Sequence, residues 1–166
     1  GRNLGEIIRQ RGSMQWNDAR PVFEQICRAL QAAHNCGVVH RDVKPENVFL
    51  AREGIGAYRR RRVKLIDFGL SRALAEPPPD RLTRIGFTVG TPMYMAPEQA
   101  LGDARADHRI DLFSMGVTLF EMVTGELPFV GKSAFYTALK RLQEPAPSPR
   151  IHLSDLDPAW ERTILR

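Results

Sequence analysis

The sequence has few cysteines and no long hydrophobic run. Its 166 residues include two cysteines, Cys27 and Cys36, and no CxxC pair. Nine positions apart on a helix, the two thiols would lie on opposite sides, so we expect neither a disulfide nor a zinc site. No apolar run approaches the roughly 20 residues that a transmembrane helix needs. These absences favour one globular domain in a reducing compartment, and we predict a cytoplasmic location without membrane contact from this segment.

The chain also lacks a second basic patch beside its one dense run of arginines. Its net charge is +5, and residues 59–62 are all arginine. Nucleic-acid binding and a solvated loop are the two interpretations of such a run. The run has no interleaved aromatic residues and no partner patch to form a binding track. We therefore favour the loop and expect no nucleic-acid partner.

A glycine-rich phosphate loop is missing too. Gly54 and Gly56 begin such a pattern, but Arg59 stands where the third glycine belongs. The sequence starts Gly-Arg-Asn rather than with methionine, and we expect it to be a piece of a longer protein.

Local signals predict helices near the N-terminus and hairpin strands after them. Asn3 and Glu6 form a capping box for a short helix that Gly12 ends. A longer helix is expected from Asn17 as N-cap, with Pro21 in its first turn, a stripe of apolar residues at spacings of three and four, and a stop at residue 37. Residues 48–50 and 63–66 are predicted as hairpin strands, with 51–62 as the loop between them.

The second half of the chain predicts one apolar helix between two polar stretches. Residues 72–90 are polar, contain three consecutive prolines and have no periodicity, which predicts a long loop. Residues 107–124 are apolar on several faces, including Leu112, so this helix is expected to be buried all round and to end at Gly125. Ser133 and Asp157 are expected to cap two further helices, with a proline-containing linker between them.

Four short motifs follow one another in a fixed order. They comprise ten specified letters, and Asp67 comes directly after a predicted strand. Any one of them alone would be a weak signal, but the ordered set makes coincidence negligible. The motifs are His40-Arg41-Asp42, Asn47 five residues after Asp42, Asp67-Phe68-Gly69 and Ala96-Pro97-Glu98.

This set resembles the signature of protein kinases. The stretch HRDVKPENVFL is similar to the Ser/Thr branch, because tyrosine kinases usually place Ala or Arg near the position of Lys44. The segment GTPMYMAPEQ resembles the corresponding segment of eukaryotic-like kinases from bacteria. The resemblance implies a partial kinase domain over residues 1–166, with an activation segment at 70–98. The implied fold is mainly α with short β-hairpins, the C-terminal lobe of a kinase without its N-terminal lobe.

The resemblance also assigns the chemistry. Phosphoryl transfer has a loose transition state, so the enzyme mainly positions groups and neutralises charge. Asp42 would accept or orient the proton of the substrate hydroxyl, and Lys44 would reach the γ-phosphate as a compact cation. Asn47 and Asp67 would supply hard oxygen ligands to Mg²⁺, with Mn²⁺ as a substitute. The implied cofactors are therefore ATP and a divalent cation, and Lys44, Asn47 and Asp67 are the expected cofactor-binding residues.

Further residues receive supporting roles from the same resemblance. Arg41 would pair with a phosphorylated activation segment, for which Thr83 and Thr88 are the candidate phosphosites; ordinary loop threonines are the alternative. Thr91 matches the threonine that bonds the catalytic Asp and Lys.

Three residues are expected to be structural. His40 is the packed motif histidine, and Asp111 would hold the backbone of the catalytic loop. Glu98 would pair with an arginine that lies beyond Arg166. A metal site on His34 and His40 is the less favoured interpretation of these two histidines.

The motifs of the smaller kinase lobe, which grips ATP, do not occur in the sequence. No G-x-G-x-x-G loop, V-A-I-K lysine or partner glutamate is found. We expect the isolated chain to be inactive and its partners to be that missing lobe and a protein substrate with Ser or Thr hydroxyls. Two alternatives remain: a pseudokinase-type regulatory module, and a small-molecule phosphotransferase. Retention of both aspartates argues against the first, and Lys44 with the APE motif argues against the second.

Overall fold

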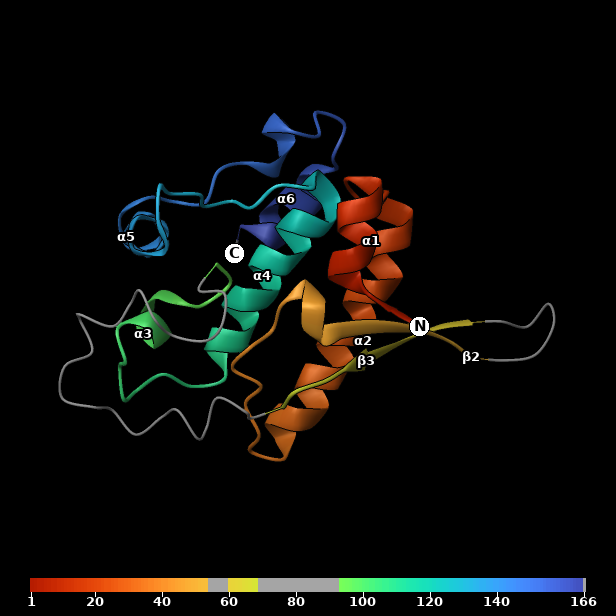
Figure 1. The fold of residues 1–166 in the computed structure, drawn as a ribbon, viewed down its shortest axis with the longest axis horizontal. Coiled ribbons are helices and arrows are strands. Elements are labelled where there is room, and N and C mark those ends of the chain that lie inside the picture. The colour runs from red at the N-terminus through yellow and green to blue at the C-terminus, as the bar shows by residue number, and fades with distance from the viewer. Residues whose placement is uncertain (54–59, 69–92, 166) are drawn as a thin grey trace.

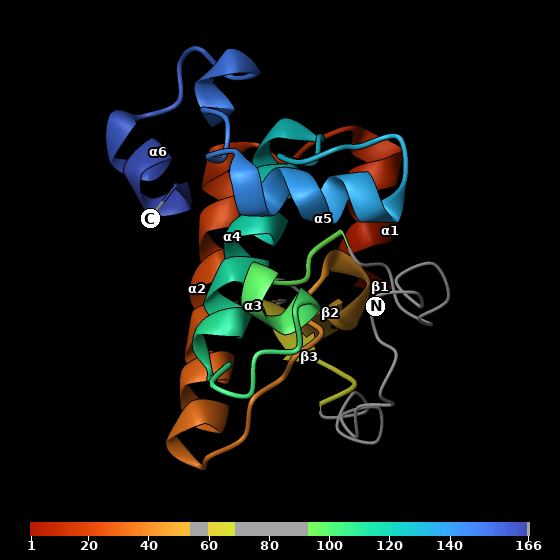
Figure 2. The ribbon, with the colours of Figure 1, turned by 90° about the vertical axis from the view of Figure 1, so that its left-hand side faces the viewer.

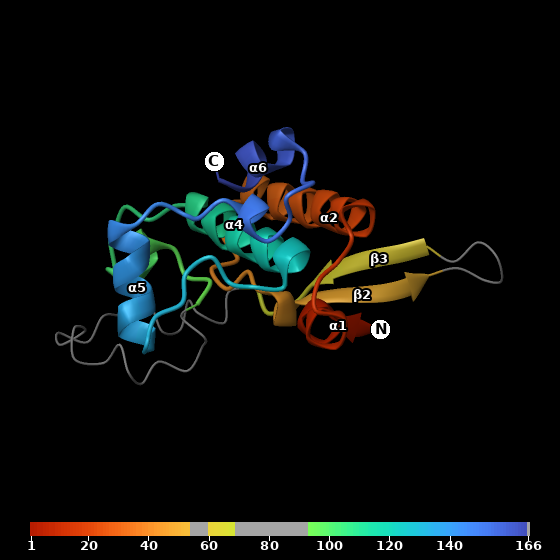
Figure 3. The ribbon, with the colours of Figure 1, turned by 90° about the horizontal axis from the view of Figure 1, so that it is seen from above.

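A long helix pair beside a small antiparallel sheet forms the centre of the molecule. The computed structural model describes residues 1–53, 60–68 and 93–165. In two perpendicular views α2 (Trp16–Asn35) and α4 (Arg109–Thr124) run side by side, and the β2–β3 hairpin projects from the same body (Figures 2 and 3). The mainly helical fold expected from the sequence is confirmed.

The first helix follows the local capping signals. Helix α1 spans Leu4–Arg11, and the Asn3 side chain accepts a hydrogen bond of 2.7 Å from the Glu6 N–H. Gly12 ends the helix with a φ of 81°. Both boundaries were predicted, because a cap depends on residues that are adjacent in sequence.

Helix α2 begins earlier than predicted. Its N-cap is Gln15 rather than Asn17, so Pro21 lies inside the helix and not in its first turn. The predicted apolar stripe does face the core, where Val22, Ile26 and Leu30 are at most 1% exposed. Both cysteines are free thiols, as expected.

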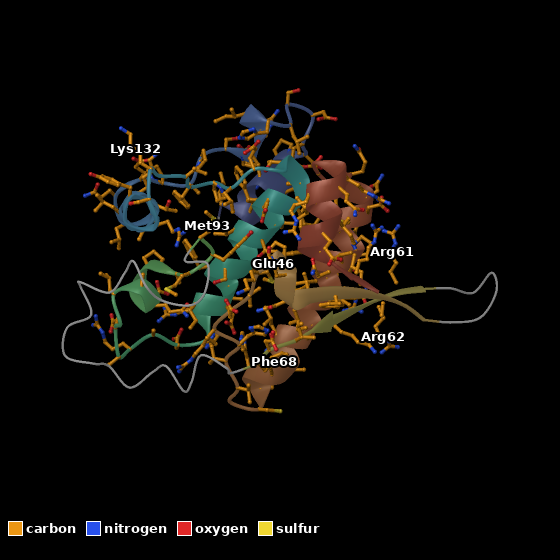
Figure 4. All side chains as sticks on the ribbon, in the orientation of Figure 1. Glu46, Arg61, Arg62, Phe68, Met93 and Lys132 are labelled. Atoms are coloured by element: carbon orange, nitrogen blue, oxygen red, sulfur yellow. The ribbon has the colours of Figure 1, made fainter. Side chains whose placement is uncertain are left out.

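The sheet has the order β1–β2–β3, with antiparallel neighbours throughout. Its strands are β1 (Arg2–Asn3), β2 (Val48–Glu53) and β3 (Arg60–Leu65). The hairpin is confirmed, but residues 51–53 and 60–62 were wrongly assigned to the loop: they pair in register from Ala51↔Arg62 to Glu53↔Arg60. Backbone pairing is indifferent to the charge of outward-facing side chains, and Arg61 and Arg62 lie on opposite sides of the hairpin (Figure 4). Gly54 and Gly56, whose spacing failed to match a phosphate loop, lie outside the described residues.

Helix α4 is the central element, but it is not buried all round. It begins at Arg109, two residues later than predicted, and ends as predicted at Gly125, where φ is 79°. Its C-terminal half is buried on several faces, with Val117, Leu119 and Phe120 at most 4% exposed, whereas Leu112 in its first turn is 47% exposed. That prediction was wrong because an apolar residue type does not by itself determine burial.

The remaining helices surround α4. Helices α3 (Pro97–Ala100) and α5 (Ala134–Gln143) lie on one side of α4 (Figure 1). Helix α6 (Pro158–Ile164) packs directly against α4. Ser133 and Asp157 cap α5 and α6 through their side chains, as predicted. A short 3-10 turn, η5 (Pro149–Ile151), lies between them. No described helix has the length and apolar character needed to cross a bilayer.

Candidate active site

The segment His40–Asn47, which the sequence predicts to be the catalytic loop, is held at its start by a buried carboxylate from α4. Asp111 is fully buried. Its two oxygens accept hydrogen bonds from the backbone N–H groups of His40 at 2.8 Å and Arg41 at 2.7 Å. The His34 ring nitrogen Nε2 also lies 2.8 Å from Asp111 Oδ2. A buried acid satisfied by several partners fixes the loop against the central helix.

Arg41 turns the loop with a left-handed backbone. Its φ is 67°, a conformation that residues with a side chain rarely adopt. The Arg41 carbonyl oxygen accepts a bond of 2.8 Å from Gln99 Nε2 of α3. The residue before Asp42 is thus held from both sides, by α4 through its N–H and by α3 through its carbonyl.

His40 connects the loop to the segment after β3. It is fully buried, its Nε2 lies 3.0 Å from the Ile66 carbonyl, and its Nδ1 accepts a bond of 3.3 Å from the Asp42 N–H. These partners require the neutral tautomer that carries its proton on Nε2. Burial lowers the pKa of His40, an effect that the Asp111 charge opposes. The ring also packs on Phe68 with centroids 4.4 Å apart.

Asp42, Lys44 and Asn47 form one polar cluster. The Lys44 ammonium lies 2.8 Å from Asp42 Oδ2. The Asn47 amide nitrogen donates to that same oxygen at 2.9 Å and to the Asp42 carbonyl at 2.8 Å. Asp42 keeps 40% of its side chain exposed, so its carboxylate is both oriented and accessible. An oriented, accessible carboxylate beside a cation is suited to receive the proton of an alcohol.

The hairpin places Asp67 beside Asn47. Val48 pairs with Leu65 at the end of the ladder, and the Ile66 N–H donates to the Asn47 carbonyl at 3.1 Å. Asp67 follows at once, exposed and with a φ of 63°. The bonds made by the Asn47 amide nitrogen leave its oxygen as the free donor atom for a cation. One amide oxygen and one carboxylate fit Mg²⁺, which keeps several waters and takes few protein ligands.

A second segment, residues 93–96, lies before α3. The Tyr94 hydroxyl donates to Glu121 Oε2 at 2.6 Å, and Ser114 Oγ donates to the Tyr94 carbonyl at 2.7 Å. Burial raises the pKa of Glu121, although the Tyr94 bond opposes this; burial also raises the pKa of Tyr94. Arg141 of α5 donates to the Met95 carbonyl at 2.8 Å. Side chains from α4 and α5 thus determine the path of this segment.

The structure therefore brings most of the residues singled out from the sequence into one neighbourhood. Asp42, Lys44, Asn47 and Asp67 gather around the catalytic loop and the adjoining end of the hairpin, with Arg41, His40 and Asp111 behind them. Glu98 lies in α3. The candidate residues Thr83, Thr88 and Thr91, and most of the 70–98 segment, lie outside the described residues.

Sequence reasoning missed Gln99, Ser114 and Arg141. Their contacts join positions 20 to 58 residues apart, so no local pattern signals them. For His34 a metal site was the less favoured interpretation, and the sequence did not indicate its contact with Asp111. In the described part of the chain, no three His, Cys, Asp or Glu side chains cluster as a metal site would require.

A cavity of about 350 Å³ lies elsewhere on the molecule. Its lining contains none of the predicted site residues: it consists of Gly1, Arg2, Ile7, Arg11, Met14, Leu50 and Arg61.

Comparisons with known proteins identify the family of the chain. Residues 1–163 match the family model of the protein kinase domain. The chain is 42% identical to the serine/threonine-protein kinase pkn3 of Myxococcus xanthus over its whole length, and 39% identical to a probable serine/threonine-protein kinase of Corynebacterium efficiens over 95% of its length. It is 37% identical to the serine/threonine-protein kinase PknL of Mycobacterium tuberculosis over 99% of its length. The chain spans 30%, 23% and 38% of these three relatives, respectively.

Proposed function

The chain belongs to the protein kinase family, and we propose that it supplies the catalytic loop and metal-binding residues of a Ser/Thr protein kinase. In the parent protein it would transfer the γ-phosphate of ATP to Ser or Thr hydroxyls of a protein substrate. We assign residues 1–166 to the C-terminal lobe and residues 70–98 to its activation segment. The Asp42 cluster supports this proposal most directly, because one carboxylate oxygen contacts both Lys44 and Asn47.

Each residue of the cluster has a separate task. Asp42 orients the substrate hydroxyl and receives its proton, while its bond to Asn47 keeps the carboxylate turned toward the site. The Lys44 side chain is 16% exposed and pairs with Asp42. With substrate bound, its ammonium would contact a phosphate oxygen in place of that carboxylate. Asn47 and Asp67 would hold Mg²⁺, and bound Mg·ATP would supply the phosphoryl group and the neutralising charge.

The test uses the full-length parent protein with ATP, Mg²⁺ and a serine-containing peptide. Asp42→Asn should lower the rate of transfer by about 10²–10⁴-fold, the usual contribution of a general base. Asp155→Asn is the matched control, since Asp155 is an exposed residue far from the loop in sequence. Peptide phosphorylation is followed with labelled ATP.

Two outcomes would contradict the proposal. Equal rates for the parent and its Asp42→Asn variant would remove the assigned base. A parent that transfers no phosphate at all would favour the regulatory alternative. We expect the isolated 166-residue chain to transfer none, because the groups that grip ATP in this family do not occur in it.

A further inference from the structure

Arg141 is an unusual residue within the group that fixes residues 93–96. It lies in the last turn of α5 and is 7% exposed. Its Nη1 donates to the Met95 carbonyl at 2.8 Å, whereas its Nε and Nη2 are buried and have no hydrogen-bond partner in the described parts of the chain. Burial lowers the pKa of Arg141 to about 10, which leaves the guanidinium charged at neutral pH.

Burying such a residue costs free energy. A guanidinium removed from water loses its hydration, and one bond to a carbonyl does not replace it. No carboxylate among the described residues forms an ion pair with Arg141. Apolar side chains of similar volume in place of buried charges are often neutral or stabilising. The contact with Met95 is therefore the feature that distinguishes arginine from methionine at this position.

The Met95 carbonyl belongs to a segment that adjoins the acceptor side of the site. Residues 93–96 lead directly into α3, and Gln99 of α3 bonds the Arg41 carbonyl next to Asp42. On the same segment Met93 is 39% exposed, which offers an apolar contact to a bound chain (Figure 4). The residues assigned to the cation, Asn47 and Asp67, are held instead by the β2–β3 hairpin.

We propose that Arg141 is a positioning residue for the protein substrate, acting through the backbone of Met95. This inference rests on the proposed function. Arg141 fixes the path of residues 93–96, and this segment receives the polypeptide on either side of the acceptor hydroxyl. Arg141 itself is buried and does not touch the substrate. Its loss displaces the segment without disturbing the hairpin that holds the metal ligands.

The test compares Arg141→Met and Arg141→Lys in the full-length parent. Methionine fills the volume without a donor, whereas lysine keeps one charged donor for the Met95 carbonyl. Lys140→Met is the matched control on the neighbouring position of α5. Peptide KM, ATP KM and kcat are measured, together with the thermal unfolding midpoint and peptide binding by fluorescence anisotropy.

For Arg141→Met we expect the peptide KM and the peptide Kd to rise about tenfold, the effect of losing one hydrogen bond to a charged group. The ATP KM, kcat and unfolding midpoint should stay at parental values, because the hydrogen bond of Arg141 reaches Met95 and neither the hairpin nor residues 40–47. Lysine should restore part of the peptide affinity, and Lys140→Met should change none of these quantities.

An unchanged peptide Kd in Arg141→Met overturns the inference, even if phosphate transfer is normal. A parallel loss of kcat, ATP affinity and unfolding midpoint also overturns it, since a purely structural role would produce that pattern. If the parent binds peptide in an Arg141-dependent manner but transfers no phosphate, the proposed function fails and the positioning role stands.

Discussion

Two buried polar residues under the catalytic loop are satisfied in different ways. Asp111 is an anion with three partners, and His40 is a neutral ring whose two nitrogens have one partner each. Protonation of His40 would convert Nδ1 from an acceptor into a donor that faces the Asp42 N–H. Burial lowers the pKa of His40, and the neutral ring that results keeps Nδ1 as an acceptor for the Asp42 N–H.

This lowered pKa makes stability depend on pH with a definite sign. The unfolded chain binds a proton at His40 near pH 6.5, whereas the folded chain binds it only at lower pH. Between these two pKa values the unfolded state carries more protons, so the free energy of unfolding should fall as the pH decreases through that window. Above about pH 6.5 the residue should contribute no pH dependence.

Urea unfolding at several pH values, from about pH 7.5 downwards, measures the effect. The His40→Gln variant keeps a polar side chain but cannot titrate, and its profile should be flatter than that of the parent in acid. The other histidines are common to both proteins, so the difference between the profiles isolates His40. Parallel profiles would contradict the assignment.

At the scale of elements, a single amide joins helix α2 to strand β3. Gln25 Oε1 accepts a bond of 3.1 Å from the Val63 N–H, and its Nε2 donates to the Arg61 carbonyl at 3.3 Å. Strand β3 is the edge of the sheet, and its outer backbone groups would otherwise lack strand partners. One side chain thus takes the place of a further strand at this edge.

We expect Gln25→Ala to loosen the hairpin locally. The Val63 amide should exchange its hydrogen about tenfold faster, because it loses a bond worth about 1 kcal/mol. Amide exchange followed by NMR resolves this position. Gln31→Ala is the control, since the Gln31 amide bonds Asn35 within α2. Equal Val63 exchange in the two variants would show that the Gln25 contacts do not hold the strand.

Elements were predictable to the extent that their signals are local. The Asn3, Ser133 and Asp157 caps were placed correctly because each cap bonds an N–H two or three residues away. The start of α2 was placed incorrectly, because its N-cap residue, Gln15, makes no side-chain hydrogen bond that the sequence could signal. The arginines at 60–62 concealed the first half of β3, since their pairing partners lie on β2 and the pairing involves backbone atoms alone.

The candidate site divides in the same manner. Asp42, Asn47 and Asp67 follow from fixed spacing in a family pattern, whereas Gln99 and Arg141 reach carbonyl groups 58 and 46 residues away. Every residue has a backbone carbonyl, so the sequence does not indicate which carbonyl a distant side chain will contact.

At the scale of the whole molecule, the ends of α1 and α4 meet at two glycines. A Cβ atom on Gly125 would lie 2.2 Å from the Gly12 carbonyl oxygen. The Met14 N–H, just beyond Gly12, donates to the Met122 carbonyl at 2.7 Å. The backbone after α1 thus packs directly against the C-terminal end of α4, and this contact leaves no room for a side chain at position 125.

Gly125→Ala should therefore be strongly destabilising. The left-handed φ of 79° costs about 1–2 kcal/mol for a residue with a Cβ, and the collision with Gly12 adds about 1–3 kcal/mol. Gly37→Ala is the matched control: its φ is 72°, and a Cβ there meets no atom of the described structure within 4 Å. Thermal and chemical unfolding should show the smaller loss for Gly37→Ala, and equal losses would argue against close contact between the two helix ends.

Arg41 and Asp67 have a consequence for how this chain tolerates change. They are the two described residues other than glycine with positive φ, and they stand next to or within the chemical groups of the site. Glycine adopts a positive φ without steric strain, so selection for stability alone would favour glycine at both positions. A change to glycine at either position would therefore stabilise the fold and at the same time remove a side chain of the proposed site. In relatives that no longer need the proposed activity, we expect these two side chains to be replaced early.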